Sequence, residues 1–239
     1  MTSARTVGEK LEWTPARRPS RIALEGRYVV VRPVDAARDA DHLFAESHPP
    51  LADVGLWTYM PTGPYRDAAA LRGALEVAGR SEDPFVLTLV PRTGGSPAGV
   101  ASYMRIAPEH GVIEIGGIWF GASLGRTTAA SEAIYLLAAH AFDELGYRRL
   151  EWKCDSLNQA SRRAAERFGF RFEGVFRQHM VIKGRNRDTA WYAITDAEWP
   201  AVGEGFSAWL APSNFDIDGR QRRTLAELIA ESRSAATRG

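Results

Sequence analysis

Three short stretches of the chain carry groups that could take part in a reaction, and the first is built around Glu114. This glutamate lies in Gly111–Phe120, an apolar and β-branched run typical of a buried strand. A carboxylate buried among apolar residues would be a good general base, acting directly or through a water. A strand glutamate can instead face solvent or bind an arginine, and the sequence leaves these alternatives open.

The second stretch, Arg126–Ala130, begins a helix. From Thr128 onward, apolar residues recur at the spacing of one helix face as far as Leu145, and Gly146 ends the helix. The first turn of such a helix has unpaired backbone N–H groups and the positive end of the helix dipole, which together suit a pyrophosphate. The small side chains here would let phosphates approach closely. Threonine and serine also begin helices that bind nothing, so a simple helix cap is the alternative.

The third stretch contains Asn158 and Ser161, which lie one turn apart at the start of a short helix. Their side chains therefore point the same way. Each could bond a ligand, and each could instead cap the helix. Cys154, just before this helix, is a nucleophile candidate, but none of the five histidines has a sequence context that ties it to this thiol. A small buried core residue is the preferred interpretation of Cys154.

A βαβ unit must hold these three groups. The periodicities predict a strand that ends at Phe120, a helix from Thr128, a strand at Arg149–Asp155 and a short helix over residues 156–168. A strand, a crossover helix and a second strand form a βαβ unit, so the two strands should be parallel and their connection right-handed.

The other predicted elements complete an antiparallel part of the sheet. They are the strands Leu24–Pro33, Phe85–Val90, Ala98–Ile106, Arg171–Lys183 and Asp188–Thr195, and the helices Ala37–Glu46, Ala68–Gly79 and Thr224–Glu231. The segment His48–Arg66 is rich in proline, glycine and aromatic residues, which predicts an ordered loop. Asp196–Pro200 is predicted to cap a further helix, and Gly203–Asn214 is predicted to be a loop.

Five sequence blocks occur in an order and spacing that match a known family. The blocks are Glu114–Trp119, Ala130–Ala133, Ala141–Leu150, Asn158–Ala165 and Phe168–Arg177, of which the last two are the most specific. They resemble the GCN5-related N-acetyltransferases (GNAT), and among these the branch that acetylates protein N-termini such as those of ribosomal proteins. The resemblance implies an α/β fold: a mixed, mostly antiparallel sheet with a splayed parallel strand pair and flanking helices.

The resemblance also implies the reaction and its residues. Acetyl-CoA would be the co-substrate, without a metal, and its acetyl group would pass directly to a primary amine. Glu114 would be the base, Ser161 would protonate the departing thiolate, and Asn158 would bind the pantetheine arm. The expected contacts to acetyl-CoA are Ile118, Trp119, Phe120, Gly125, Arg126, Thr127, Thr128, Ala129, Ala130 and Asn158, and those to the acceptor are Trp57, Tyr59, Met60 and Tyr65. The four acceptor residues could equally pack their loop onto the core.

Backbone groups of the first strand of the unit would polarise the acetyl carbonyl. A strand that splays away from its parallel neighbour leaves ladder N–H groups without partners, and Gly116 and Gly117 would permit such a splay. An ordinary β-bulge is the alternative explanation of the two glycines.

The phosphate loop departs from the family pattern, which reads Gln or Arg, two residues, Gly, one residue, and Gly or Ala. One frame puts Gly125 at the basic position, with Thr128 and Ala130 at the glycine positions. A frame shifted by one puts Arg126 at the basic position, with Ala129 and Ser131 as the small residues. An altered pyrophosphate contact follows, and this departure supports the alternative function of a non-catalytic acyl-CoA-binding module.

The whole chain argues against several other classes of protein. Thirty basic and 29 acidic residues give a net charge of +1, which indicates neither nucleic acid nor an acidic membrane as a partner. The single cysteine excludes an internal disulfide and a zinc site built from cysteines. No apolar run approaches the ~20 residues that span a bilayer, and Met1–Ser20 lacks the apolar core of a signal peptide. A cytoplasmic protein is therefore expected.

Three parts are predicted along the 239 residues: an N-terminal arm (1–23), an N-acetyltransferase domain (24–200) and a C-terminal extension with one helix (201–239). The expected partners are acetyl-CoA and an amine, either a peptide N-terminus or a small molecule. A resistance or detoxification enzyme with the same chemistry is a further alternative, and the two extensions leave a homodimer open.

Overall fold

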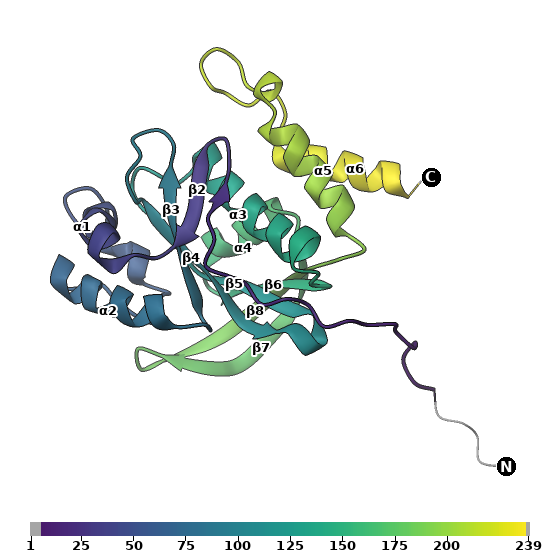
Figure 1. The fold of residues 1–239 in the computed structure, drawn as a ribbon, viewed down its shortest axis with the longest axis horizontal. Coiled ribbons are helices and arrows are strands. Elements are labelled where there is room, and N and C mark those ends of the chain that lie inside the picture. The colour runs from purple at the N-terminus through teal and green to yellow at the C-terminus, as the bar shows by residue number, and fades with distance from the viewer. Residues whose placement is uncertain (1–5, 238–239) are drawn as a thin grey trace.

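The computed structural model describes residues 6 to 237, and its centre is one eight-stranded sheet (Figure 1). The strand order is β1-β2-β3-β4-β5-β6-β8-β7, and every neighbouring pair is antiparallel except β5 and β6. The strands are β1 (Leu24–Glu25), β2 (Val29–Pro33), β3 (Phe85–Pro91), β4 (Gly99–Ala107), β5 (Val112–Phe120), β6 (Arg149–Asp155), β7 (Arg171–Ile182) and β8 (Arg185–Thr195). The predicted mixed sheet with one parallel pair is therefore confirmed.

Helices cover both faces of this sheet. They are α1 (Ala36–Ser47), α2 (Ala68–Arg80), α3 (Thr128–Ala139), α4 (Gln159–Arg167), α5 (Trp199–Leu210) and α6 (Leu225–Ala236). Along β3, Leu87 and Leu89 point into the larger core, which α3, α5 and α6 cover, whereas Val86 points into a smaller core with Leu71 and Leu75 of α2. Since alternate strand residues face opposite sides, the two cores lie on opposite faces. Among the described residues no helix combines the length and the apolar character needed to cross a membrane.

The parallel pair β5 and β6 is joined over a short distance only. Its pairs are Val112 with Arg149, Ile113 with Leu150, and Glu114 with Glu151, and none follows beyond Glu114. The register of β5 against β4 shifts near Gly116, and Gly117 has a φ of 59°, a left-handed conformation that strains other residue types. The two strands are thus unpaired beyond Glu114 and Glu151, as the predicted splay requires, and a register shift of the kind made by a β-bulge, the alternative explanation, is present as well. The region between the unpaired parts of β5 and β6 is here called the V.

The first predicted strand, Leu24–Pro33, is wrong as a single element. The chain reverses after β1, and β2 pairs back on it antiparallel. A buried carboxylate of α3 holds the reversal, because Glu132 accepts hydrogen bonds from the backbone N–H groups of Arg27 (2.9 Å), Tyr28 (2.5 Å) and Val29 (2.9 Å). A side chain at Gly26 would collide with that carboxylate. The residue that fixes this turn is about a hundred positions away along the chain, so local sequence cannot reveal it.

The C-terminal prediction also needs correction, because α5 runs through the segment expected to be a loop. The glycines at 203 and 205 resemble helix breakers, yet Val202, Phe206 and Trp209 recur at helical spacing and enter the main core. At Gly205 an added Cβ would lie 2.6 Å from the side chain of Ile229 in α6. The glycine therefore permits close packing of α5 on α6. The structure has two helices here, and both belong to the main core.

Replacing Phe206 with alanine should test this packing. Phe206 is 1% exposed, and its ring lies 5.5 Å from that of Tyr135 and 6.1 Å from that of Phe168. We expect the free energy of unfolding to fall by about 3–5 kcal/mol, the usual effect of a large cavity in a core. Urea unfolding of the full chain measures it. The fully exposed Ile217, replaced by alanine, is the control and should change stability by about 0.5 kcal/mol or less. A loss of similar size in both variants would contradict the core assignment.

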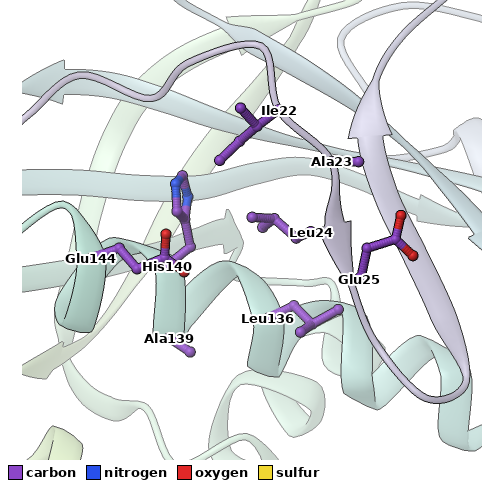
Figure 2. A pocket seen from close by; sticks show the side chains of 8 residues that line it. All are labelled: Ile22, Ala23, Leu24, Glu25, Leu136, Ala139, His140 and Glu144. Atoms are coloured by element: carbon purple, nitrogen blue, oxygen red, sulfur yellow. The ribbon is translucent and has the colours of Figure 1, made fainter.

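The N-terminal arm packs along the surface where the structure describes it; residues 1–5 lie outside the described part. The indole N–H of Trp13 donates to the carbonyl of Glu109 (3.0 Å), and the backbone N–H of Arg17 donates to that of Leu145 (2.8 Å). Beneath the arm is a hollow of about 250 Å³ (Figure 2), lined by Ile22, Ala23, Leu24, Glu25, Leu136, Ala139, His140 and Glu144. It faces the C-terminal end of α3, whereas the V faces the N-terminal end.

Candidate active site

Glu114 occupies the closed end of the V. Its side chain is 4% exposed, and its Oε2 atom lies 2.6 Å from Nη1 of Arg105 and 3.0 Å from Nζ of Lys153. Both cations bind this one oxygen. The other oxygen, Oε1, has no hydrogen-bond partner among the described residues and lies 2.8 Å from the position that a Cβ at Gly116 would take. The glycine therefore leaves Oε1 uncovered on the side where the strands separate.

Lys153 connects Glu114 to a row of alternating charges across the sheet. Its ammonium lies 2.6 Å from Oε2 of Glu151 and 3.9 Å from the centre of the Trp191 ring, and its side chain is almost completely buried. Arg149 continues the row by pairing with Glu151 and Glu173, and its hydrogen bond to Glu173 is the main reason that the pKa of Arg149 is raised. Arg105 and Lys153 thus both contact Glu114. The sequence offered a base or an arginine partner as alternatives, and the geometry permits both.

At the open end of the V, the loop between β5 and α3 forms the predicted helix start. Thr127 is the N-cap of α3, and its hydroxyl accepts from the backbone N–H of Ala130 (3.2 Å) and donates to the carbonyl of Leu124 (2.7 Å). Arg126 has a φ of 64°, a left-handed conformation uncommon outside glycine. Successive backbone N–H groups in such a turn form a concave anion-binding surface. The exposed side chain of Arg126 is the basic group of this loop.

The end of α1 contacts the loop between β5 and α3, which is the predicted phosphate loop. Glu46 accepts from the backbone N–H of Ala122 through its carbonyl (3.0 Å) and from that of Ser123 through its carboxylate (2.8 Å). The backbone N–H of Gly121 donates to the carbonyl of Ala98 (2.7 Å), at a place where a side chain on Gly121 would not fit. These contacts hold the loop between β5 and α3, and the first turn of α3 points its N–H groups toward the mouth of the V.

The start of α4 forms the second wall, where Asn158 and Ser161 lie together as predicted. Asn158 is the N-cap: its Oδ1 accepts from the backbone N–H of Ser161 (3.0 Å), which leaves the amide NH₂ for a ligand. The Ser161 hydroxyl accepts from the indole N–H of Trp152 (3.0 Å). Burial raises the pKa of the Cys154 thiol, with a smaller opposing effect of the Ser161 hydroxyl. A protonated, buried thiol is a poor nucleophile, which disfavours the alternative placed on Cys154.

The loop His48–Arg66, which carries the four predicted acceptor residues and is here called the acceptor loop, reaches the V from the side of α1 and α2. Trp57 is 2% exposed and packs against Tyr65 (5.4 Å between ring centres) and Trp119 (5.5 Å), so both tryptophan rings hold the loop on the smaller core. Met60 also packs there, partly buried. Tyr59 is 37% exposed, and its hydroxyl donates to the carbonyl of Leu157 beside α4 (3.3 Å). For Trp57 the geometry favours packing, whereas Tyr59 presents its ring at the mouth.

Lys183 joins the acceptor loop to the turn between β7 and β8. Its ammonium donates to the carbonyl of Trp57 (2.8 Å), so this basic residue has a structural contact that a merely solvated turn would lack. On the same hairpin a polar hollow of about 650 Å³ is lined by Arg177, Gln178, Asn186 and Asp188. Within residues 6–237 no cluster of three or more histidine, cysteine, aspartate or glutamate side chains could hold a metal ion.

Three residues of this region were missed by sequence reasoning: Lys153, Trp152 and Trp191. The alternation along β6 does place Glu151 and Lys153 on one face, a signal that was present in the sequence. The register that brings Trp191 opposite Lys153 depends on the pairing of β6 with β8, which the local sequence does not encode.

Comparisons with known proteins agree with this geometry. Residues 29–171 match the family model described as an acetyltransferase (GNAT) domain. The crystal structure of a GCN5-related N-acetyltransferase from Brucella melitensis is 48% identical, with a TM-score of 0.89, and covers 92% of this chain and 99% of its own. A candidate GNAT acetyltransferase from Chromobacterium violaceum is 38% identical, with a TM-score of 0.75, over 82% of this chain and 98% of its own.

A curated relative is more distant. The Bacillus subtilis protein YdaF, named as a candidate ribosomal N-acetyltransferase, is 29% identical over 105 residues, which are 44% of this chain and 57% of YdaF. The chain thus matches little more than half the length of this relative.

Proposed function

The chain belongs to the GNAT family of acetyltransferases, and we propose that it transfers an acetyl group from acetyl-CoA directly to a primary amine. The observation that carries this proposal is the V itself: a carboxylate with one uncovered oxygen at its closed end, and the N-terminus of α3 at its open end. A carboxylate suits removal of a proton from an amine, and a helix N-terminus suits a pyrophosphate.

The residues that would hold acetyl-CoA line the V. The first turn of α3 and the loop before it, Gly125–Ala130, would bind the pyrophosphate, and the amide NH₂ of Asn158 would bind the pantetheine arm. Backbone N–H groups of Ile118, Trp119 and Phe120 lie on the part of β5 that β6 does not pair. N–H groups of successive strand residues point to opposite neighbours. Because that of Gly121 donates to Ala98 next to β4, the N–H of Phe120 faces the unpaired side and would donate to the acetyl carbonyl oxygen, where charge develops during the reaction.

Glu114 and Ser161 would handle the protons. Oε1 of Glu114 takes a proton from the acceptor ammonium, directly or through a water, and the free amine attacks the carbonyl carbon. As the C–S bond breaks, the sulfur keeps the electron pair and the Ser161 hydroxyl gives it a proton. The attacking nitrogen becomes positively charged and loses a second proton to solvent, which leaves the neutral amide. The serine oxygen then regains a proton from water, and Glu114 releases its proton to solvent.

A peptide N-terminus is the acceptor that the open face of the sheet supports best. Beside Lys153 this face carries Trp191, with the rings of Phe176 and His179 centred 4.5 and 6.0 Å away, and Phe176 is 52% exposed. A peptide can lie across such a surface while its amine enters the V. The name of YdaF agrees with this acceptor class. A small-molecule amine is the other acceptor within this proposal, and a cytoplasmic location and a homodimer belong to the proposal as well.

A non-catalytic acyl-CoA-binding module is a second candidate, favoured by one observation. In one frame of the family pattern Gly125 stands where the pattern has Gln or Arg, and Thr128 stands where it has glycine, which would alter the pyrophosphate contact.

A turnover assay separates the two functions. The purified chain is mixed with acetyl-CoA and a panel of short peptides with free N-termini and small primary amines, and free CoA is measured. We expect at least one amine to raise CoA release above the rate without amine, with the acetylated product seen by mass spectrometry. Binding of acetyl-CoA without amine-dependent release would contradict the enzyme and support the module.

A further inference from the structure

Trp152 holds the Ser161 hydroxyl in one orientation. Its indole Nε1 donates to the serine oxygen over 3.0 Å. The indole itself is 4% exposed, and the rings of Phe168 and Phe170 fix it at 6.0 and 5.6 Å. Trp152 is also the first residue of β6 beyond the last pair with β5. The bond therefore lies where the V begins to open.

The direction of this hydrogen bond determines where the serine proton points. An indole N–H only donates, whereas a hydroxyl has one proton and two acceptor positions. Because the serine oxygen accepts from Trp152, its own proton is directed away from the indole. Asn158 fixes the backbone of Ser161 through the helix cap, and the thiol of Cys154 lies near the same hydroxyl. A hydroxyl that accepts one hydrogen bond also becomes a stronger donor in the next.

We propose that Trp152 is a positioning residue that aims the Ser161 hydroxyl at the departing sulfur. The inference rests on the proposed function. Trp152 touches neither the thioester nor the amine, and acts only through the serine: the indole keeps its proton throughout, while the serine proton moves to the sulfur and the oxygen regains one from water. No hydroxyl or carboxylate partner is needed to orient the serine.

The test removes the indole N–H and keeps a ring. Trp152→Phe should lower the rate constant for CoA release about fivefold to tenfold, as expected for one lost hydrogen bond, with the KM for acetyl-CoA unchanged. Release with water as acceptor breaks the same C–S bond, so the assay does not depend on knowing the amine. In a Ser161→Ala background, Trp152→Phe should have no further effect. Trp199→Phe is the matched control, because it removes an indole N–H of α5 that donates to Asp143 (2.7 Å) after the end of α3, and it should leave the rate unchanged.

A second readout does not require turnover. CoA bound to the wild type should ionise at lower pH than free CoA, because a hydrogen bond favours the thiolate, and ultraviolet absorbance of the thiolate follows this titration. Trp152→Phe should move the pH at which bound CoA ionises back toward that of free CoA, and Ser161→Ala should do the same.

The outcomes separate two failures. Two results would overturn the inference. The first is that the thiol of bound CoA ionises at the same pH in Trp152→Phe as in the wild type. The second is that Trp152→Phe lowers the rate equally in the wild type and in the Ser161→Ala background. Absence of CoA binding in the wild type would instead overturn the proposed function.

Discussion

Thr128→Glu should abolish acetyl-CoA binding while the fold is retained. Thr128 is the first residue of α3, and its side chain lies at the mouth of the V. A glutamate there fills space beside the phosphates and adds a negative charge where a pyrophosphate must sit. We expect the dissociation constant to rise by about a hundredfold or more, the equivalent of roughly 2.7 kcal/mol. Isothermal titration calorimetry measures it directly.

A matched control exists in α6, which also begins after a threonine cap. Ala226 lies in its first turn, is exposed, and belongs to the C-terminal helices. Ala226→Glu places the same charge at a helix N-terminus remote from the V, where acidic residues favour the helix dipole. It should bind acetyl-CoA as the wild type does. Equal binding by Thr128→Glu and the wild type would show that the carrier does not use the α3 terminus.

Glu114→Gln should lower kcat on the order of 10²- to 10³-fold, the range typical of a lost general base. Glutamine keeps the size of the side chain but cannot accept the ammonium proton. Lys153 keeps its contact with Glu151 in this variant, so no buried cation loses all of its partners. The KM for acetyl-CoA should stay near the wild-type value. Steady-state kinetics with the fastest amine of the panel measures both constants.

Glu151→Gln is the control for the ion pairs. Glu151 is the direct partner of Glu114 across the parallel pair and also binds Lys153, so both substitutions remove one carboxylate from the same ammonium. Only Glu114 has an uncovered oxygen on the side of the V. We expect Glu151→Gln to retain kcat within about threefold. The substitution weakens the ion pair with Lys153, and a small change in such a pair has an effect of this size. If the two variants lost activity equally, the row of charges would matter and Glu114 would not be a specific base.

Much of the site could be predicted because its parts are encoded locally. A helix start needs only the residues that begin it, so Thr127 and Thr128 indicated the phosphate loop. Two adjacent glycines near the end of an apolar strand indicated the splay, and Gly117 has the left-handed conformation that only glycine adopts easily. Asn158 and Ser161 could be placed together because one helical turn separates them.

The remainder depends on contacts that no local pattern contains. The role of Trp57 was left open because an aromatic loop residue is as well suited to a core as to a ligand, and its burial against Trp119 favours packing. Glu114 contacts Arg105 of β4 and Lys153 of β6, and the register of these strands determines that the two side chains lie beside it. The start of helix α5 was predicted at Asp196–Pro200, but Gly203–Asn214 was wrongly predicted to be a loop, because the packing of Gly205 on Ile229 is not visible in the local sequence.

The most direct test of the central claim is a crystal structure of the chain with bound CoA. The account predicts the pyrophosphate at the N-terminus of α3 and the sulfur between the unpaired parts of β5 and β6, within hydrogen-bond reach of the Ser161 hydroxyl. CoA bound elsewhere, for example in the hollow beside Arg177 and Asp188 with the V empty, would contradict the assignment of the V as the acetyl-transfer site.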